Sequence, residues 1–140
     1  MSLRFGLWPC LGFALTATGC GSMYSYYGSA DAATLKTNGK LTAMDSDTRT
    51  REAGVFYIEP GTRVIGLRGK ANSSRQRVLL LDVAPHTRYR VDIQGDGASN
   101  SNWSVDAKGK APTPVYRWCD AQLACKVNEP FDHCVRRTCP

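Results

Sequence analysis

The sequence lacks the residue patterns on which most known catalytic sites depend. It has only two histidines, His86 and His133, and contains no Gly-x-Ser-x-Gly motif, phosphate-binding loop or histidine-rich metal spacing. A hydrolytic triad needs a nucleophile beside a histidine that a carboxylate orients, but His86 follows Pro85 in an expected turn and His133 adjoins Cys134. We therefore expect a protein that is not an enzyme and that needs no cofactor.

Long apolar runs and helical periodicity are also scarce. Residues 5–18 form an uncharged segment rich in Leu, Phe, Ala and Gly, but a transmembrane helix needs about 20 apolar residues. No other segment approaches that length, and no stretch shows a sustained helical period. The pattern therefore favours neither a membrane-spanning chain nor a helical bundle.

The N-terminal segment has the organisation of an export signal. Arg4 precedes the apolar run, and the small residues Ala17 and Gly19 precede Cys20. Cleavage before Cys20 would leave this cysteine as the first residue of the mature chain. The alternative is an ordinary signal peptide followed by an unmodified cysteine.

Residues 15–20, LTATGC, resemble the lipobox of bacterial lipoproteins, although Ala17 stands where the common lipobox has leucine. The resemblance implies a diacylglyceryl thioether on the Cys20 sulfur and an acyl chain on its amino group. More than one chain holds a protein stably on a bilayer. The resemblance also implies the outer membrane, facing the periplasm, because Gly21 rather than aspartate follows the cysteine.

The cysteine count agrees with an acylated Cys20. Six cysteines are present, and cleavage would remove Cys10. An odd number would remain, which in an exported protein leaves one thiol to explain. Acylation of Cys20 would leave four cysteines, enough for two disulfides: Cys119, Cys125, Cys134 and Cys139.

We divide the chain into four segments. These are a signal peptide (1–19), a lipidated N-terminus with a flexible Gly/Ser-rich tether (20–31), a β-rich domain (32–111) and a Cys-rich tail (112–140). Pro112 marks the start of the tail, which we expect to be a brace appended to the domain.

Segment 32–111 has the pattern of successive short strands. Asn38-Gly39 is a turn signal between two of them. Residues 78–81 (VLLL) indicate a central strand covered on both faces. Residues 88–94 alternate between apolar and polar side chains, which is typical of a half-buried strand.

These strands predict a fold that is mainly β, a small antiparallel β-sandwich or barrel-like domain with a disulfide-braced C-terminal tail. We expect its core to contain Leu80, Tyr89, Val91 and Trp103. The runs FYIEPGTRVIGLR, RVLLLDVAPHTRYRVDI and NWSVDA also resemble a recurring pattern in small β-rich envelope lipoproteins of poorly defined function. That resemblance implies no catalytic residues.

The tail cysteines predict two disulfides, because an exported protein meets an oxidising environment. If residues 128–131 form the turn of a β-hairpin, Cys125 faces Cys134, and Cys119 comes within one residue of register with Cys139. We therefore prefer this nested pairing among three possible connectivities. The rival is a zinc site with His133, but the spacing lacks the Cys-x2-Cys pairs usual in structural zinc sites.

A basic stretch follows the expected strand at 55–59. Its cations have no acid among them in the sequence and flank one predicted hairpin: Arg63, Arg68, Lys70, Arg75 and Arg77. Such a patch suits an anionic envelope component, including lipid headgroups, or an acidic envelope protein. The alternative is a charged strand edge that discourages aggregation. Nucleic acid is not an expected partner for an exported chain.

The sequence thus predicts a lipid-anchored cell-envelope protein that acts as a non-catalytic binding or structural module. The alternative is an inhibitor or protective lipoprotein whose Cys-rich tail blocks the active site of a partner.

Overall fold

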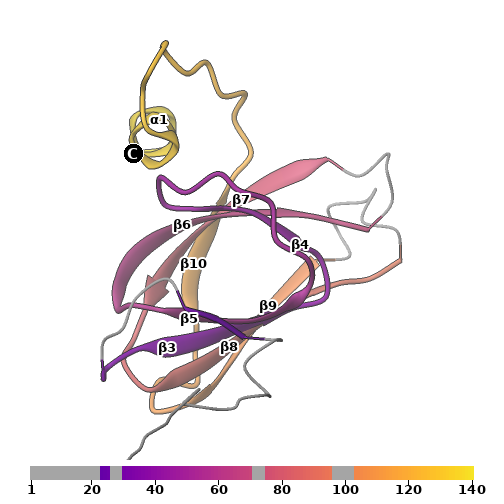
Figure 1. The fold of residues 1–140 in the computed structure, drawn as a ribbon. Coiled ribbons are helices and arrows are strands. Elements are labelled where there is room, and N and C mark those ends of the chain that lie inside the picture. Colours follow the sequence, from indigo (N-terminus) through magenta and orange to yellow (C-terminus); the bar gives the residue numbers. More distant parts are fainter. Residues whose placement is uncertain (1–22, 26–29, 71–74, 96–102) are drawn as a thin grey trace, which may run out of the picture.

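The computed structural model describes residues 23–25, 30–70, 75–95 and 103–140 (Figure 1). The expected signal peptide and Cys20 lie outside these residues. Within them, the chain is mainly β, as the sequence predicts, and forms two sheets and one short helix. The elements are β2 (Met23–Ser25), β3 (Ala33–Thr37), β4 (Lys40–Met44), β5 (Gly54–Ile58), β6 (Gly61–Arg68), β7 (Gln76–Val83), β8 (Thr87–Ile93), β9 (Trp103–Gly109), β10 (Val115–Cys119) and α1 (Phe131–Thr138).

The two sheets lie face to face as a sandwich (Figure 1). One sheet has four strands in the order β10-β7-β6-β4, and the other has five in the order β2-β5-β3-β8-β9. Most neighbouring strands are antiparallel, but β2 with β5 and β3 with β8 are parallel pairs. In Figure 1 the five-stranded sheet is the lower layer, and α1 lies above the four-stranded sheet.

The Asn38-Gly39 turn does not close a hairpin, because β3 and β4 belong to different sheets. The Asn38 side chain instead binds the backbone of Ile93, donating to its carbonyl at 2.9 Å and accepting from its N–H at 2.8 Å. A side chain at Gly39 would overlap that of Ile93 and lie 2.6 Å from the Arg68 carbonyl oxygen. Glycine is therefore required where the chain passes between the layers.

The main core fills the space between the sheets. β8 alternates as predicted, with Tyr89, Val91 and Ile93 buried in this core together with Trp103. The hydroxyl of the buried Tyr89 has two hydrogen-bond partners. It accepts from the Ala84 N–H at 2.8 Å and donates to the Asp82 carbonyl at 3.3 Å. Burial of such large apolar side chains is the dominant stabilising term for a sandwich of this size.

β7 is buried on both faces, as its apolar run predicts. Its alternate residues enter the main core, whereas Val78 and Leu80 join a second cluster on the outer face of the four-stranded sheet with Val64, Cys119 and Val135. The expectation that Leu80 belongs to the sandwich core was wrong, because α1 and the tail form a further layer over this face.

The tail is not a separate brace. β10 pairs with β7 along its whole length, so the expected boundary at Pro112 precedes an integral strand of the four-stranded sheet. The predicted hairpin was also wrong, since its second half forms α1. Phe131, Cys134 and Val135 share one helical face that packs on the sheet, and Asp132 favours the helix by lying in its first turn.

Part of the expected flexible tether is also a strand. β2 lies at the edge of the five-stranded sheet, with Met23 opposite Val55 in β5. Only residues 21 and 22 separate this strand from Cys20. Among the described residues, no helix is long and apolar enough to span a membrane.

Candidate functional site

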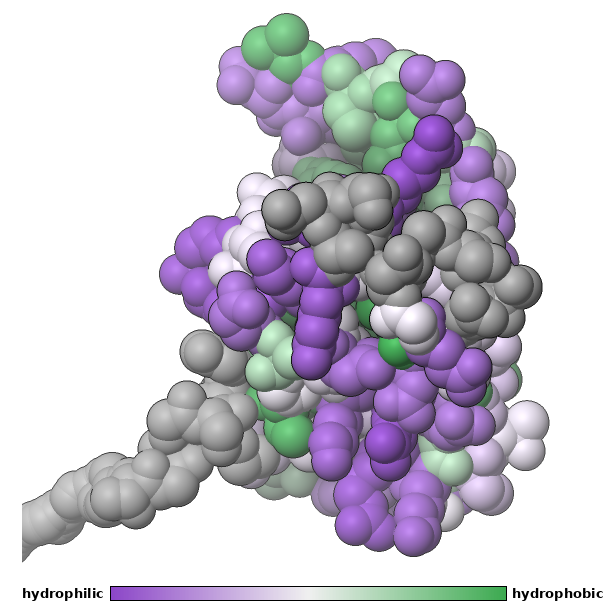
Figure 2. Space-filling model, turned by 90° about the vertical axis from the view of Figure 1, so that its right-hand side faces the viewer, coloured by the Kyte–Doolittle hydropathy of each residue, from purple (hydrophilic) through white to green (hydrophobic). Residues whose placement is uncertain are grey.

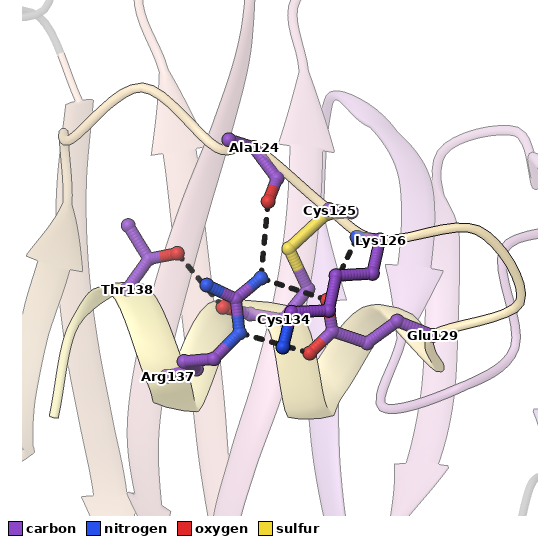
Figure 3. Close-up of a disulfide and its surroundings, with 7 residues drawn as sticks. All are labelled: Ala124, Cys125, Lys126, Glu129, Cys134, Arg137 and Thr138. Carbon is purple, nitrogen blue, oxygen red and sulfur yellow. Dashed lines mark hydrogen bonds and ion pairs between the residues drawn. A yellow bond between two sulfur atoms is a disulfide. The ribbon is translucent and has the colours of Figure 1, made fainter.

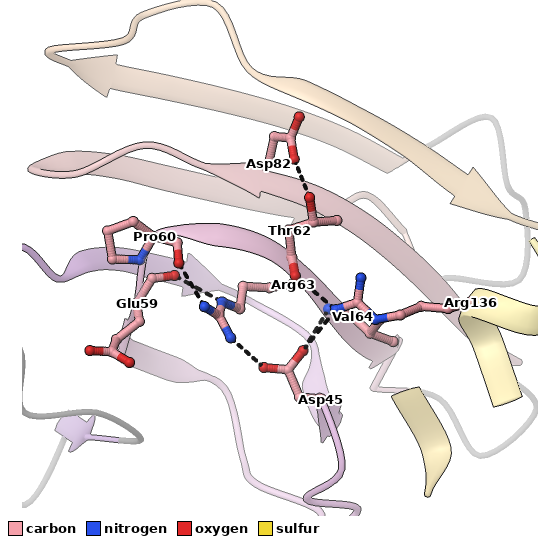
Figure 4. A network of polar contacts seen from close by, with 8 residues as sticks. All are labelled: Asp45, Glu59, Pro60, Thr62, Arg63, Val64, Asp82 and Arg136. Carbon is pink, nitrogen blue, oxygen red and sulfur yellow. Dashed lines mark hydrogen bonds and ion pairs between the residues drawn. The ribbon is translucent and has the colours of Figure 1, made fainter. Parts of the chain in front are cut away.

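The structure divides the predicted basic stretch into three environments. Arg63 is half-buried near the start of β6, at the other end of the strand from Arg68. Its guanidinium forms an ion pair with Asp45 at 3.1 Å and donates to the carbonyls of Glu59 and Pro60 at 3.0 and 2.6 Å (Figure 4). This arginine is therefore structural.

Arg77 is also mostly buried, at the end of β7. Its guanidinium carbon lies 4.0 Å from the ring centre of Trp118 and 5.4 Å from that of Trp103, and an Nη atom lies 3.2 Å from a carboxylate oxygen of Asp120. The two tryptophans contact each other edge to face. Because a cation on an aromatic face stabilises the packing, Arg77 joins β7, β9 and β10 at this end of the sandwich.

The other three cations lie at the β6–β7 end of the four-stranded sheet. Lys70 and Arg75 are exposed, and Arg68 is half-buried opposite Lys40 in β4. Arg75 and Arg77 border a shallow depression of about 300 Å³ between β7 and the tail. The basic stretch is thus not one continuous surface, because two of its five members are occupied by structural contacts.

The tail contains the predicted disulfides, Cys119–Cys139 and Cys125–Cys134. The connectivity is confirmed, although it arises from a loop and a helix rather than from a hairpin. Cys125, Cys134 and the Glu129 carboxylate come close enough together to suggest a metal cluster. Both sulfurs are in the disulfide, so the thiolates that zinc needs are not available.

A tight turn, which we call the tail tip (residues 126–129), projects beside this disulfide (Figure 3). The Glu129 N–H donates to the Lys126 carbonyl at 3.1 Å, and Asn128 adopts a left-handed φ of 64°. Arg137 donates two hydrogen bonds to the Glu129 carboxylate, at 2.8 and 3.0 Å. At the corner of this braced turn, Val127 is 91% exposed.

The contact with Arg137 changes the acidity of Glu129. Hydrogen bonds from the Arg137 side chain, and then from the Lys126 N–H, lower the pKa of Glu129 from 4.5 to about 2. The carboxylate is therefore charged across the physiological range, and the turn keeps its brace.

A second polar network fixes α1 on the sandwich. The buried Asp45 carboxylate accepts a hydrogen bond from the Val64 N–H at 3.0 Å and lies 3.9 Å from the Arg136 guanidinium (Figure 4). Arg136 also donates to the Thr62 carbonyl at 2.8 Å. α1 is thus held by polar contacts as well as by its apolar face.

The two histidines occupy open positions. His86 Nε2 lies 3.4 Å from Asp31 Oδ1, but both side chains are more than half exposed. His133 is exposed on α1. The pair with Asp31 therefore lacks the enclosure in which a histidine–carboxylate pair acts as a general base.

Sequence reasoning missed a cluster of cations on the outer face of the five-stranded sheet, which we call the cationic face. All its members are exposed and come from β3, β8 and β9: Lys36, Arg88, Arg90 and Lys108. They border a shallow depression of about 260 Å³. The signal was present in the sequence as the polar positions of alternating strands, but only the sheet order brings these positions together.

No family model matches this chain, and neither a curated protein nor a solved structure does.

Proposed function

We propose that the chain is a lipid-anchored cell-envelope protein, attached through Cys20 to the outer membrane, whose β-sandwich is a non-catalytic binding or structural module. The observation that carries the proposal is the cysteine arrangement. The four described cysteines are all in disulfides. After cleavage of a signal peptide, Cys20 is the one other cysteine that remains, and it is the last residue of the lipobox-like run.

The disulfides support the exported location on independent grounds. Such bonds form and persist in oxidising compartments and are rare in the bacterial cytosol. The Cys119–Cys139 disulfide belongs to the apolar cluster beneath α1, which supports a structural role. The open histidines and the shallow depressions favour binding over catalysis.

Membrane fractionation of the expressed protein tests the anchor. Wild type is expected in the membrane fraction, and Cys20→Ser is expected to lose this partition or to remain unprocessed, because the acylated sulfur is gone. Cys10→Ser is the matched control, since that cysteine lies within the expected signal, and it should fractionate like wild type. Equal partition of all three proteins would contradict the anchor.

The tail tip favours a second candidate function, that of an inhibitor or protective lipoprotein which inserts the tip into a partner's cleft. A turn braced by a disulfide and an ion pair loses little conformational entropy on binding. Val127→Arg should abolish capture of such a partner from native envelope, whereas the matched Val115→Arg, at an exposed site on β10, should not. Unchanged capture by both variants would exclude the tip as the contact.

A further inference from the structure

We propose that the cationic face is the surface that rests on the anionic phosphate headgroups of the membrane, and that it orients the sandwich on that membrane. The inference rests on the proposed lipid anchor, which would hold the five-stranded sheet close to the bilayer. It concerns different residues from the basic stretch that the sequence suggested.

The cationic face carries more positive than negative charge. Arg90 forms an ion pair with Asp92 at 2.9 Å and lies opposite Asp106 in β9. Within the described part of the chain, no carboxylate is paired with the other three cations, Lys36, Arg88 and Lys108. The face therefore keeps a net positive charge that can attract phosphate groups.

Two cations of the cationic face lie opposite each other in neighbouring strands, and their repulsion destabilises the sheet in the free protein. Arg88 in β8 lies directly opposite Lys108 in β9. Like charges at directly opposed positions destabilise a sheet, and an anion between them would remove that repulsion. Thr34, next to Arg88 across β3 and β8, adds a side-chain hydroxyl to the rim of the same depression.

The path of the chain brings this face to the membrane. β2 is the edge strand of the five-stranded sheet, and three extended residues span at most about 11 Å, so Cys20 lies within that distance of Met23. Neighbouring strands are about 4.8 Å apart, which places β3, β8 and β9 within about 20 Å of β2. A lipid on Cys20 would therefore keep the whole cationic face near the headgroups.

The opposite layer carries the tail. α1 packs on the outer face of the four-stranded sheet, and the tail tip projects on the same side of the molecule, away from the cationic face (Figure 1). In Figure 2 hydrophilic residues dominate the lower part with a few apolar residues among them, and the upper part shows a larger group of apolar residues between hydrophilic ones. Docking through the cationic face would thus present the tail tip toward the aqueous compartment, where a partner can reach it.

Vesicle binding by the full chain carrying Cys20→Ser tests this surface without the covalent lipid. The probe is vesicles of equal parts phosphatidylglycerol and phosphatidylcholine, with vesicles of phosphatidylcholine alone as reference. The test variant replaces Lys36, Arg88 and Lys108 with Gln. Its matched control, which also loses two lysines and one arginine, replaces Lys40, Arg117 and Lys126, which lie on the four-stranded layer or the tail.

Each basic side chain near an anionic surface contributes about fivefold, so the test variant should bind anionic vesicles on the order of 100-fold more weakly. The control should bind like its parent, because its cations belong to the four-stranded sheet or the tail and not to the docked face. Circular dichroism should show both variants folded, since all six sites are at least partly exposed.

Equal losses in test and control would overturn the proposal by showing that binding depends only on net charge. A third variant, with Gln at Arg68, Lys70 and Arg75, would overturn it if that variant alone lost binding, since the β6–β7 end would then be the docking surface. The vesicle experiment uses a protein without lipid, so its result does not depend on acylation. If Cys20 of the wild-type protein carried no lipid, the proposed anchor would be refuted, but the measured binding of the cationic face to vesicles would remain valid.

Discussion

Val135→Ala tests whether α1 is an integral layer of the fold. Val135 is fully buried in the cluster with Val64, Val78 and Leu80. Removing its two methyl groups loses about 0.8 kcal/mol for each and leaves a cavity, while the better helix propensity of alanine returns about 0.5 kcal/mol. We expect a net loss of about 2 kcal/mol in the free energy of unfolding, or on the order of 1 M in the urea midpoint.

Val127→Ala is the matched control for this change. It makes the same substitution in the same tail, but at a side chain that is 91% exposed, so its effect should stay within about 0.5 kcal/mol. Far-ultraviolet circular dichroism and tryptophan fluorescence should report one coincident urea transition, because Trp118 and the tail share the four-stranded sheet. Equal small effects of the two substitutions, or a separate early transition of the tail, would refute the packing of α1.

Two further predictions concern charged groups. The pKa of Glu129 is lowered in the folded state, so its contact with Arg137 contributes stability above the ordinary pKa of 4.5 that is lost as pH falls through about 2. The protection of the tail-tip amides, measured against their intrinsic exchange rate at each pH, should therefore fall over this range in wild type and show no such acid transition in Glu129→Gln. Arg63→Gln should lower the free energy of unfolding by about 1–3 kcal/mol, because it removes the 3.1 Å ion pair of the buried Asp45 carboxylate. The exposed Arg88→Gln should be neutral or slightly stabilising in the same urea titration, and equal effects would show that Arg63 is not structural.

Local patterns in the sequence determined the strands well. The alternation in β8 and the double-sided burial of β7 follow from which residues are apolar, because side chains alternate between the faces of a strand. The same patterns do not determine which strand pairs with which. Asn38-Gly39 looked like a hairpin turn, yet it joins two sheets, since the hydrogen bonds of Asn38 go to the distant Ile93.

The disulfide pairing in the tail was predicted correctly, although the predicted β-hairpin was wrong. Sequence separation alone brings Cys125 near Cys134 in either a hairpin or a loop followed by a helix. α1 is only eight residues long, too short to show a helical period clearly, and its stability comes from packing on the sheet. The spacing of Phe131, Cys134 and Val135 was the one available signal.

The candidate surfaces were the least predictable feature. Cations that are close in sequence, such as Arg63 and Arg77, turned toward Asp45 and toward two tryptophan rings. The cationic face instead joins positions up to 72 residues apart, from Lys36 to Lys108, and depends on the order of three strands. Charge clusters in a β protein therefore have to be read from the sheet and not from the chain.

Mass spectrometry of the N-terminal peptide of the protein, extracted from the envelope of a bacterium that expresses the full chain, tests directly whether Cys20 is the acylated first residue of the mature protein. We expect a peptide that begins at Cys20 and carries the mass of a diacylglyceryl thioether together with an N-linked acyl chain. A peptide that begins at another residue, or a Cys20 with a free amino group and no lipid mass, would contradict it.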